Sequence, residues 1–182
     1  MKQTLITLSI LLLSTPLFGQ SSSKYTADDM IKLIRHKFYE EGIFDQTKTS
    51  AEQGDAVAQY EVGNMFLSCW VDLDDNIPDE LQTRPWCKGT EKDLRQSFEW
   101  IKKAAEQGDA KVQHVLGAMY DHGKGVVEDD KQAIHWYRKA AEQSHAPAQS
   151  NLGILYAKGE GVMQDFVVAH MWFDIASLSG YK

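Results

Sequence analysis

The chain of 182 residues has few prolines and cysteines, and it has no long apolar run beyond its first residues. Four prolines interrupt helices only rarely, and Ala, Gln, Glu, Lys and Leu, which suit helices, are common. Two cysteines permit one disulfide. No segment after the N-terminus approaches the length that a membrane-spanning helix needs. The composition therefore favours an all-α protein without internal membrane spans.

Basic residues are outnumbered by acidic ones and do not cluster. The formal net charge is −7, from 19 Lys and Arg against 26 Asp and Glu. An acidic surface repels phosphate groups, and no Lys/Arg cluster offsets that repulsion. We therefore expect neither nucleic acid nor an anionic membrane as a partner.

The N-terminus has the pattern of a secretory signal peptide. Lys2 supplies the positive start, residues 5–13 are mainly apolar, and Gly19 offers a small residue at a cleavage point. Cleavage there would leave Gln20 as the first residue of a mature chain with a net charge of −8, because residues 1–19 contain one Lys and no acid. No cysteine follows the apolar run, which argues against a lipoprotein anchor, and an uncleaved membrane anchor is the alternative. We expect a periplasmic or secreted protein.

The body of the chain repeats itself every 36 residues. Three pairs of segments show this offset: 100–107 with 136–143, 116–120 with 152–156, and 123–126 with 159–162. An earlier copy at 51–56 matches 105–110 at an offset of 54, so the first unit carries an insertion of 18 residues. A period of this length is typical of solenoid proteins.

Each unit is predicted to form two antiparallel helices. In the third unit, Asp130 is the expected N-cap of a helix that buries Tyr137, and a second helix starts near Pro147 and buries Leu152. Gly153, in the middle of that second helix, costs about 1 kcal/mol of helix propensity relative to alanine. We therefore expect a neighbouring helix to approach it closely. Such short pairs bury their faces only by stacking, which predicts an α-solenoid.

The pattern Trp-x-x-Lys-Ala-Ala-Glu-Gln-Gly-Asp-Ala-x-x-Gln-x-x-Leu-Gly-x-Met-Tyr-x-x-Gly-x-Gly-Val resembles the Sel1-like repeat, a relative of the tetratricopeptide repeat, over roughly residues 51–181. The resemblance implies a solenoid that acts as an adaptor for protein partners, in a family that rarely has a catalytic centre. The tryptophans at 100, 136 and 172 are expected in the core between helices. By analogy with tetratricopeptide grooves, the candidate partner-binding residues are polar side chains of the second helices: Gln113, His114, Gln149 and Asn151.

We divide the chain into a signal peptide (1–19), a flexible lead with an N-terminal capping helix (20–49) and the repeat solenoid (50–182). Residues 46–50 lack the Trp-x-x-Lys-Ala signature of the other units, so the first helix of the first unit is expected to be degenerate or absent. At the other end, residues 171–179 are expected to form a lone helix that closes the stack, with Trp172 packed against the preceding unit.

The two cysteines mark the base of the insertion. The offset of 54 aligns Cys69 with Gly123, and the offset of 36 aligns Cys87 with the same glycine. The inserted residues must leave and return at this point, so the two Cα atoms should lie near the roughly 5.5 Å that a disulfide prefers. We predict a Cys69–Cys87 disulfide, with two free thiols as the alternative. The enclosed loop carries Trp70 and Trp86, which are further candidates for partner binding.

No catalytic or metal-binding pattern stands out. The six histidines lack zinc spacing, and the acidic segment 72–76 matches only the first positions of a calcium loop. Ser-x-x-Lys occurs at 21–24 and 179–182 without the other motifs of penicillin-recognising enzymes. We predict a scaffold, without metal or cofactor, that binds a peptide or protein segment in a concave helical groove. The alternative is a β-lactam or peptidoglycan hydrolase of the cysteine-rich repeat type.

Overall fold

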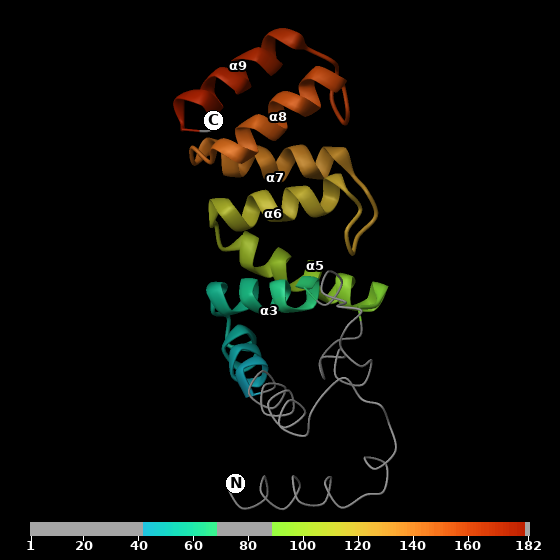
Figure 1. The fold of residues 1–182 in the computed structure, drawn as a ribbon, viewed down its shortest axis with the longest axis vertical. Coiled ribbons are helices and arrows are strands. Elements are labelled where there is room, and N and C mark those ends of the chain that lie inside the picture. The colour runs from blue at the N-terminus through green and yellow to red at the C-terminus, as the bar shows by residue number, and fades with distance from the viewer. Residues whose placement is uncertain (1–41, 69–88, 181–182) are drawn as a thin grey trace, which may run out of the picture. The chain divides into compact units, whose positions relative to one another are not determined.

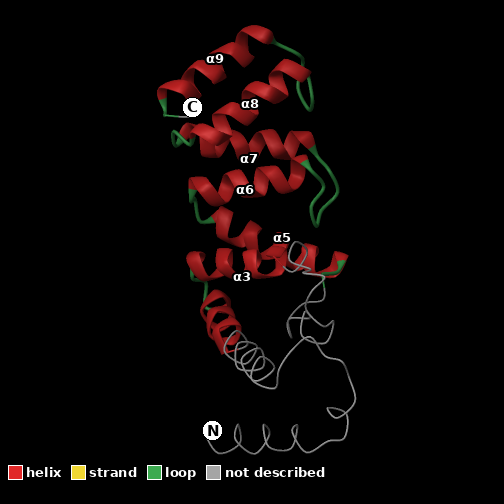
Figure 2. Ribbon diagram, in the orientation of Figure 1, coloured by secondary structure: helices red, strands yellow, loops and turns green. Residues whose placement is uncertain are grey.

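The computed structural model describes residues 42–68 and 89–180. Within these ranges the regular structure is entirely α-helical, with no strand (Figure 2). The all-α solenoid expected from the 36-residue period is confirmed. The segments predicted as a signal peptide and a capping helix, the insertion and both cysteines lie outside the described residues.

The helices follow one another up the stack in chain order (Figure 1). After a helix at 42–52 they are α3 (Ala56–Ser68), α5 (Glu91–Glu106), α6 (Ala110–Asp121), α7 (Asp130–Glu142), α8 (Ala146–Lys158) and α9 (Phe166–Leu178). Helix α5 packs on α3, and each helix from α6 to α9 packs on the helix before it. The first helices of the units are therefore 42–52, α5, α7 and α9, and the second helices are α3, α6 and α8.

Aspartate side chains fix where several helices begin. Oδ1 of Asp109 accepts a hydrogen bond from the Val112 amide at 2.9 Å, and Oδ1 of Asp129 accepts one from the Gln132 amide at 3.0 Å. Such N-caps satisfy amide donors that a helix start otherwise leaves unpaired. The N-cap of α7 is thus Asp129, one residue before the Asp130 that the sequence suggested, because the Asp129 backbone is extended and Asp130 is already helical.

The glycine in the middle of each second helix lies against a side chain of the next unit. A Cβ atom on Gly63 would lie 2.6 Å from Cγ1 of Ile101, and one on Gly117 would lie 2.6 Å from Cδ1 of Tyr137. Gly153 repeats the arrangement, with 2.6 Å to Cε1 of Phe173. The close approach expected from Gly153 alone is therefore present at all three described second helices.

Each repeat tryptophan packs on the core of the unit before its own. Trp136 is 7% exposed and belongs to the core that α5 and α6 form. Trp100 lies against the core around α3, and Trp172 lies against the core of α7 and α8. In α5 and α7 a lysine covers the ring, with Nζ of Lys103 and Lys139 at 4.5 and 4.4 Å from the ring centroids. The tryptophans therefore join consecutive units.

A row of glutamines also crosses the unit boundaries, in which an exposed glutamine of one unit donates to a buried glutamine of the unit before it. Nε2 of Gln107 donates to Oε1 of Gln59 at 2.9 Å, and Nε2 of Gln143 donates to Oε1 of Gln113 at 2.8 Å. Each acceptor glutamine in turn donates to a carbonyl oxygen at the end of the first helix of its own unit. The residue equivalent to Gln143 in the next unit is Ser179, which has no side-chain amide. The buried Oε1 of Gln149, which would accept the corresponding hydrogen bond, has no partner among the described residues. The row therefore stops one glutamine short.

We expect Ser179→Gln to complete the row and stabilise the fold by about 1 kcal/mol. Ser179 follows α9 with φ −78° and ψ 4°, close to the φ −81° and ψ −6° of Gln107, so the backbone already suits a glutamine whose amide reaches Gln149. Thermal unfolding followed by circular dichroism should show a higher midpoint. Ser179→Glu is the matched control, because it has the same size, no donor and a negative charge. An equal gain in both variants would contradict the glutamine mechanism.

The first and last helices differ from those of the regular units. Of the two outcomes expected for the first helix, degenerate or absent, the structure shows a degenerate one: residues 42–52 are helical without the repeat signature, because Phe44 and Ala51 are buried against α3 and supply the packing that the tryptophan and alanines supply elsewhere. Helix α9 begins at Phe166, five residues before the expected start, because Oδ1 of Asp165 accepts hydrogen bonds from the Val167 and Val168 amides. The docking of α9 on the preceding unit is as expected, with Ala169 and Ala176 buried.

Candidate functional site

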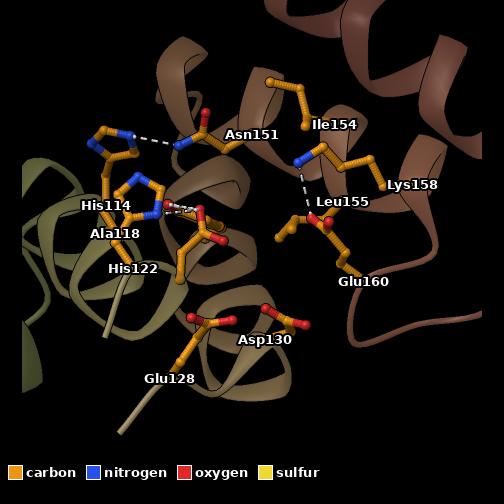
Figure 3. Close-up of a pocket in the computed structure, with 12 residues that line it drawn as sticks. His114, Ala118, His122, Glu128, Asp130, Asn151, Ile154, Leu155, Lys158 and Glu160 are labelled. Atoms are coloured by element: carbon orange, nitrogen blue, oxygen red, sulfur yellow. Dashed lines mark hydrogen bonds and ion pairs between the residues drawn. The ribbon is translucent and has the colours of Figure 1, made fainter. Parts of the chain in front are cut away.

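An open cleft of about 660 Å³ lies between the second helices α6 and α8, with α7 at its floor (Figure 3). Helix α6 contributes His114 and Asp121, and α8 contributes Asn151 and Ile154. The loop after α6 adds Glu128, and the whole cleft therefore draws on the second and third units of the stack. It is formed where the repeat brings equivalent helices to the same side.

Two of the residues predicted from sequence meet in this cleft. Nδ2 of Asn151 lies 3.2 Å from Nε2 of His114, although the residues are 37 positions apart (Figure 3). Burial, and then the nearby His145, lower the pKa of His114 from 6.5 to about 4. His114 is therefore neutral at pH 7, and its Nε2 can accept a hydrogen bond from the Asn151 amide, which places its proton on Nδ1.

The neutral state of His114 makes the fold sensitive to acid. Because its pKa in the folded chain lies below the ordinary value of 6.5, the unfolded chain takes up a proton first as the pH falls. The stabilising contribution of neutral His114 is complete above about pH 6.5 and declines as the pH approaches about 4.

Tyr137 and Asp121 form the second polar pair of the cleft. The Tyr137 hydroxyl donates to Oδ2 of Asp121 at 3.1 Å. Burial, and then the Asp121 charge, raise the pKa of Tyr137 well above its usual value, so the hydroxyl stays protonated. The His114 ring lies over this tyrosine, with 5.5 Å between ring centroids. The floor of the cleft is thus held rigidly by hydrogen bonds and ring contacts.

The rim of the cleft is mainly acidic. Glu128, Asp130 and Glu160 line it, and the one lysine there, Lys158, lies 3.1 Å from Oε2 of Glu160 (Figure 3). That ion pair cancels one negative charge and leaves the carboxylates of Glu128 and Asp130 in excess. Beside them, Ile154 is 41% exposed and offers an apolar contact. The arrangement suits a ligand that carries positive charge next to an apolar group.

The other predicted contact residues lie elsewhere. Gln113 and Gln149 are buried, and their side-chain amides donate to the carbonyl oxygens of Ala105 and Ala141. They hold the helix pairs together and are not presented to the cleft. Trp70 and Trp86 lie outside the described residues. Sequence reasoning missed Tyr137 and Asp121 as cleft residues, since Tyr137 occupies a core position of the repeat.

The described residues offer little else that resembles a reactive centre. Within 42–68 and 89–180, no group of three or more His, Cys, Asp and Glu side chains is placed to hold a metal ion. Of the two Ser-x-x-Lys matches, Ser179 simply follows α9 as its C-cap. In the same ranges, none of the helices combines the length and the apolar character needed to cross a bilayer.

Comparison with known proteins identifies the repeat. The Sel1 repeat model matches residues 87–109, 110–145 and 146–181, and the last two segments reproduce the 36-residue unit found in the sequence. The chain belongs to the Sel1 repeat family. This family is generally one of non-catalytic scaffolds, and Sel1 repeats generally mediate protein–protein interaction. A search of curated proteins gives no match.

Two solved structures support the assignment. A Sel1 repeat protein from Oxalobacter formigenes is 32% identical, with 75% of this chain and 90% of that chain covered and a TM-score of 0.58. The protein c5321, a protective antigen of uropathogenic Escherichia coli strains with an SLR fold, is 34% identical at a TM-score of 0.62. The match covers 75% of this chain but only 26% of the antigen, so this Sel1 repeat chain spans about a quarter of that protein.

Proposed function

We propose that this protein is a periplasmic or secreted scaffold that holds a peptide or protein segment in the cleft between α6 and α8. The observation that carries the proposal is the cleft itself, with its rigid polar floor and acidic rim. The signal-peptide pattern at residues 1–19 supports export. No step of chemistry is required, because the cleft side chains bind and orient without a nucleophile.

The charges of the cleft favour a segment with a basic side chain. Glu128 and Asp130 line the rim, and neither forms an ion pair with another described residue. A Lys or Arg side chain would lie between them, while an adjacent apolar side chain contacts Ile154. Backbone groups of the segment can compete for the side-chain amide of Asn151, which in the free protein lies 3.2 Å from His114 (Figure 3). Side-chain charge gives the preference, and the amide groups fix the orientation.

A peptide-binding assay tests this proposal. Fluorescein-labelled peptides that differ only in one central residue, Lys, Gln or Glu, are titrated with the protein, and anisotropy is measured. We expect affinity to fall in that order. The variant Glu128→Gln/Asp130→Asn should bind the Lys peptide up to about 30-fold more weakly, since each of the two exposed charge pairs contributes up to about 1 kcal/mol.

The control removes two negative charges elsewhere. Glu99→Gln/Glu106→Gln changes the net charge equally, on exposed positions of α5 outside the cleft. It should leave the affinity unchanged. An equal loss in both double variants would mean that only overall charge matters, and binding of none of the peptides would contradict a peptide-binding cleft.

The insertion is the second part of the proposal. We infer that a Cys69–Cys87 disulfide closes this loop and that Trp70 and Trp86 add contacts to the bound segment. The support is the alignment of both cysteines with Gly123, the point where an ordinary unit turns.

A further inference from the structure

One face of the first helices is polar in every unit except the last. Four positions of α5 and of α7, spaced by 4, 4 and 3 residues, lie on the side of the helix away from its neighbours. All of them are exposed and carry charged or polar groups. They are Arg95, Glu99, Lys103 and Glu106 in α5, and Lys131, His135, Lys139 and Glu142 in α7. This is what a solvated outer face of a solenoid requires.

In α9 the same four positions are apolar. They carry Val167, Met171, Ile175 and Leu178, which we call the outer stripe. Val167, Met171 and Leu178 are 81%, 47% and 89% exposed. Four charged or polar side chains have thus been replaced by four apolar ones on a single helix face. Ile175 is partly buried, so Val167, Met171 and Leu178 form the exposed part of this apolar surface, and such a surface marks a site of association.

A further repeat stacked on α9 would not cover the outer stripe. In α7, the face that meets the following helix α8 carries Ile134, Tyr137 and Ala141, all buried. The equivalent residues of α9 are His170, Phe173 and Ser177. An additional helix pair would cover those three and leave the outer stripe exposed, as it is in α5 and α7. The stripe therefore serves an occupant from outside the solenoid.

The spacing of the stripe suits another helix. Three residues of the stripe, Met171, Ile175 and Leu178, form a series with the neighbouring Val168. The four apolar residues are separated by 3, 4 and 3 positions. This is the spacing of the contact seam between two paired helices. We propose that two copies of this protein associate through the outer stripe, with α9 of one copy packed against α9 of the other.

The charges on α9 favour a second copy over a lipid surface. An interface between identical copies brings the same patch of both together, so charged side chains at these positions, such as Lys131 and Lys139 of α7, would have to lose their hydration there. In α9 these positions are Val167 and Ile175. A helix that lies on an anionic membrane carries Lys or Arg beside its apolar face, whereas α9 has neither. The one carboxylate of α9, Asp174, lies 3.0 Å from Nδ1 of His170 on the same helix.

The test is the oligomeric state of the purified protein in its native processed form. Sedimentation equilibrium should show a monomer–dimer equilibrium. The variant Val167→Lys/Met171→His/Ile175→Lys/Leu178→Glu gives α9 the outer face of α7 and should weaken the dimer at least about 100-fold. Its helix content should stay unchanged. Leu178→Glu alone changes a side chain that is 89% exposed, so it should leave the fold intact. It should weaken the dimer to a smaller extent, and it keeps the proposal testable if the fourfold variant does not fold.

The matched control replaces exposed apolar residues outside the stripe. Val127 and Met163 lie in the loops before α7 and α9 and are 85% and 89% exposed. Val127→Lys/Met163→Lys should leave the dimer intact. The proposal is overturned if the protein stays monomeric at a concentration about 100-fold above 1 μM. It is also overturned if the fourfold variant still dimerises. Cosedimentation of the monomer with phosphatidylcholine vesicles would instead assign the stripe to a lipid surface.

Discussion

Replacing Trp136 with alanine is expected to destabilise the protein by about 3–5 kcal/mol. The indole is 7% exposed and fills the core that α5 and α6 share, where it packs on the unit before its own. Its loss therefore removes contacts inside one unit and also the contact that joins two units. In a stack whose stability is a sum of unit and neighbour terms, both terms fall together.

Urea unfolding followed by far-ultraviolet circular dichroism measures the effect. Trp172→Ala is the matched comparison, because Trp172 has the same place in the repeat but is only half-buried. Its loss should cost clearly less. Equal losses for the two variants, or an unchanged midpoint for Trp136→Ala, would show that the repeat tryptophans do not join the units as the packing indicates.

Much of the architecture follows from the sequence because the repeat imposes the same physical demands on each unit. Gly153 predicted a close approach, and Phe173 lies there. The spacing of Trp136 and Trp172 predicted core positions, and both pack on the preceding unit. These inferences succeeded because a residue whose size or apolar character is needed recurs at a fixed interval.

Polar residues were harder to place, since polarity alone does not distinguish a groove from a buried hydrogen-bond network. Gln113 and Gln149 were predicted to face a partner, yet they pair with backbone groups inside the stack. The signal was available in the sequence: Gln59, Gln113 and Gln149 recur in register, as do Gln107 and Gln143. A surface contact residue has no reason to recur in every unit, whereas a structural pair does.

The helix at 42–52 shows that a segment can keep its place in the fold after its sequence has lost the repeat pattern. Its sequence has lost the repeat signature, but Phe44 is buried in edge-on contact with Phe66, at 5.7 Å between ring centroids. A different aromatic residue therefore supplies the packing that the signature supplies in later units. Packing against a neighbour decides whether such a short segment is helical, and local pattern does not reveal it.

The substitution Gly125→Ala is expected to cost about 2–4 kcal/mol, more than most changes on an exposed turn. Gly125 has a φ of +71°, a conformation that alanine adopts only at a cost of about 1–2 kcal/mol. A Cβ there would also overlap the carbonyl group of Leu94, which belongs to the backbone of α5 and cannot rotate away. Either the turn or the start of α5 must move.

Gly123→Ala separates these two causes. Gly123 has a similar φ of +62°, but the nearest atom to its Cβ would be the Val126 carbonyl oxygen at an ordinary 3.5 Å. This control should therefore lose only the conformational part, about 1–2 kcal/mol. Chemical denaturation of the two variants gives the difference directly. If they are equally destabilised, the contact between the turn and α5 does not hold the turn. A larger loss of stability for Gly125→Ala would show that the contact between Gly125 and Leu94 holds the turn in place. The same turn carries Glu128, three residues further on, to the rim of the cleft.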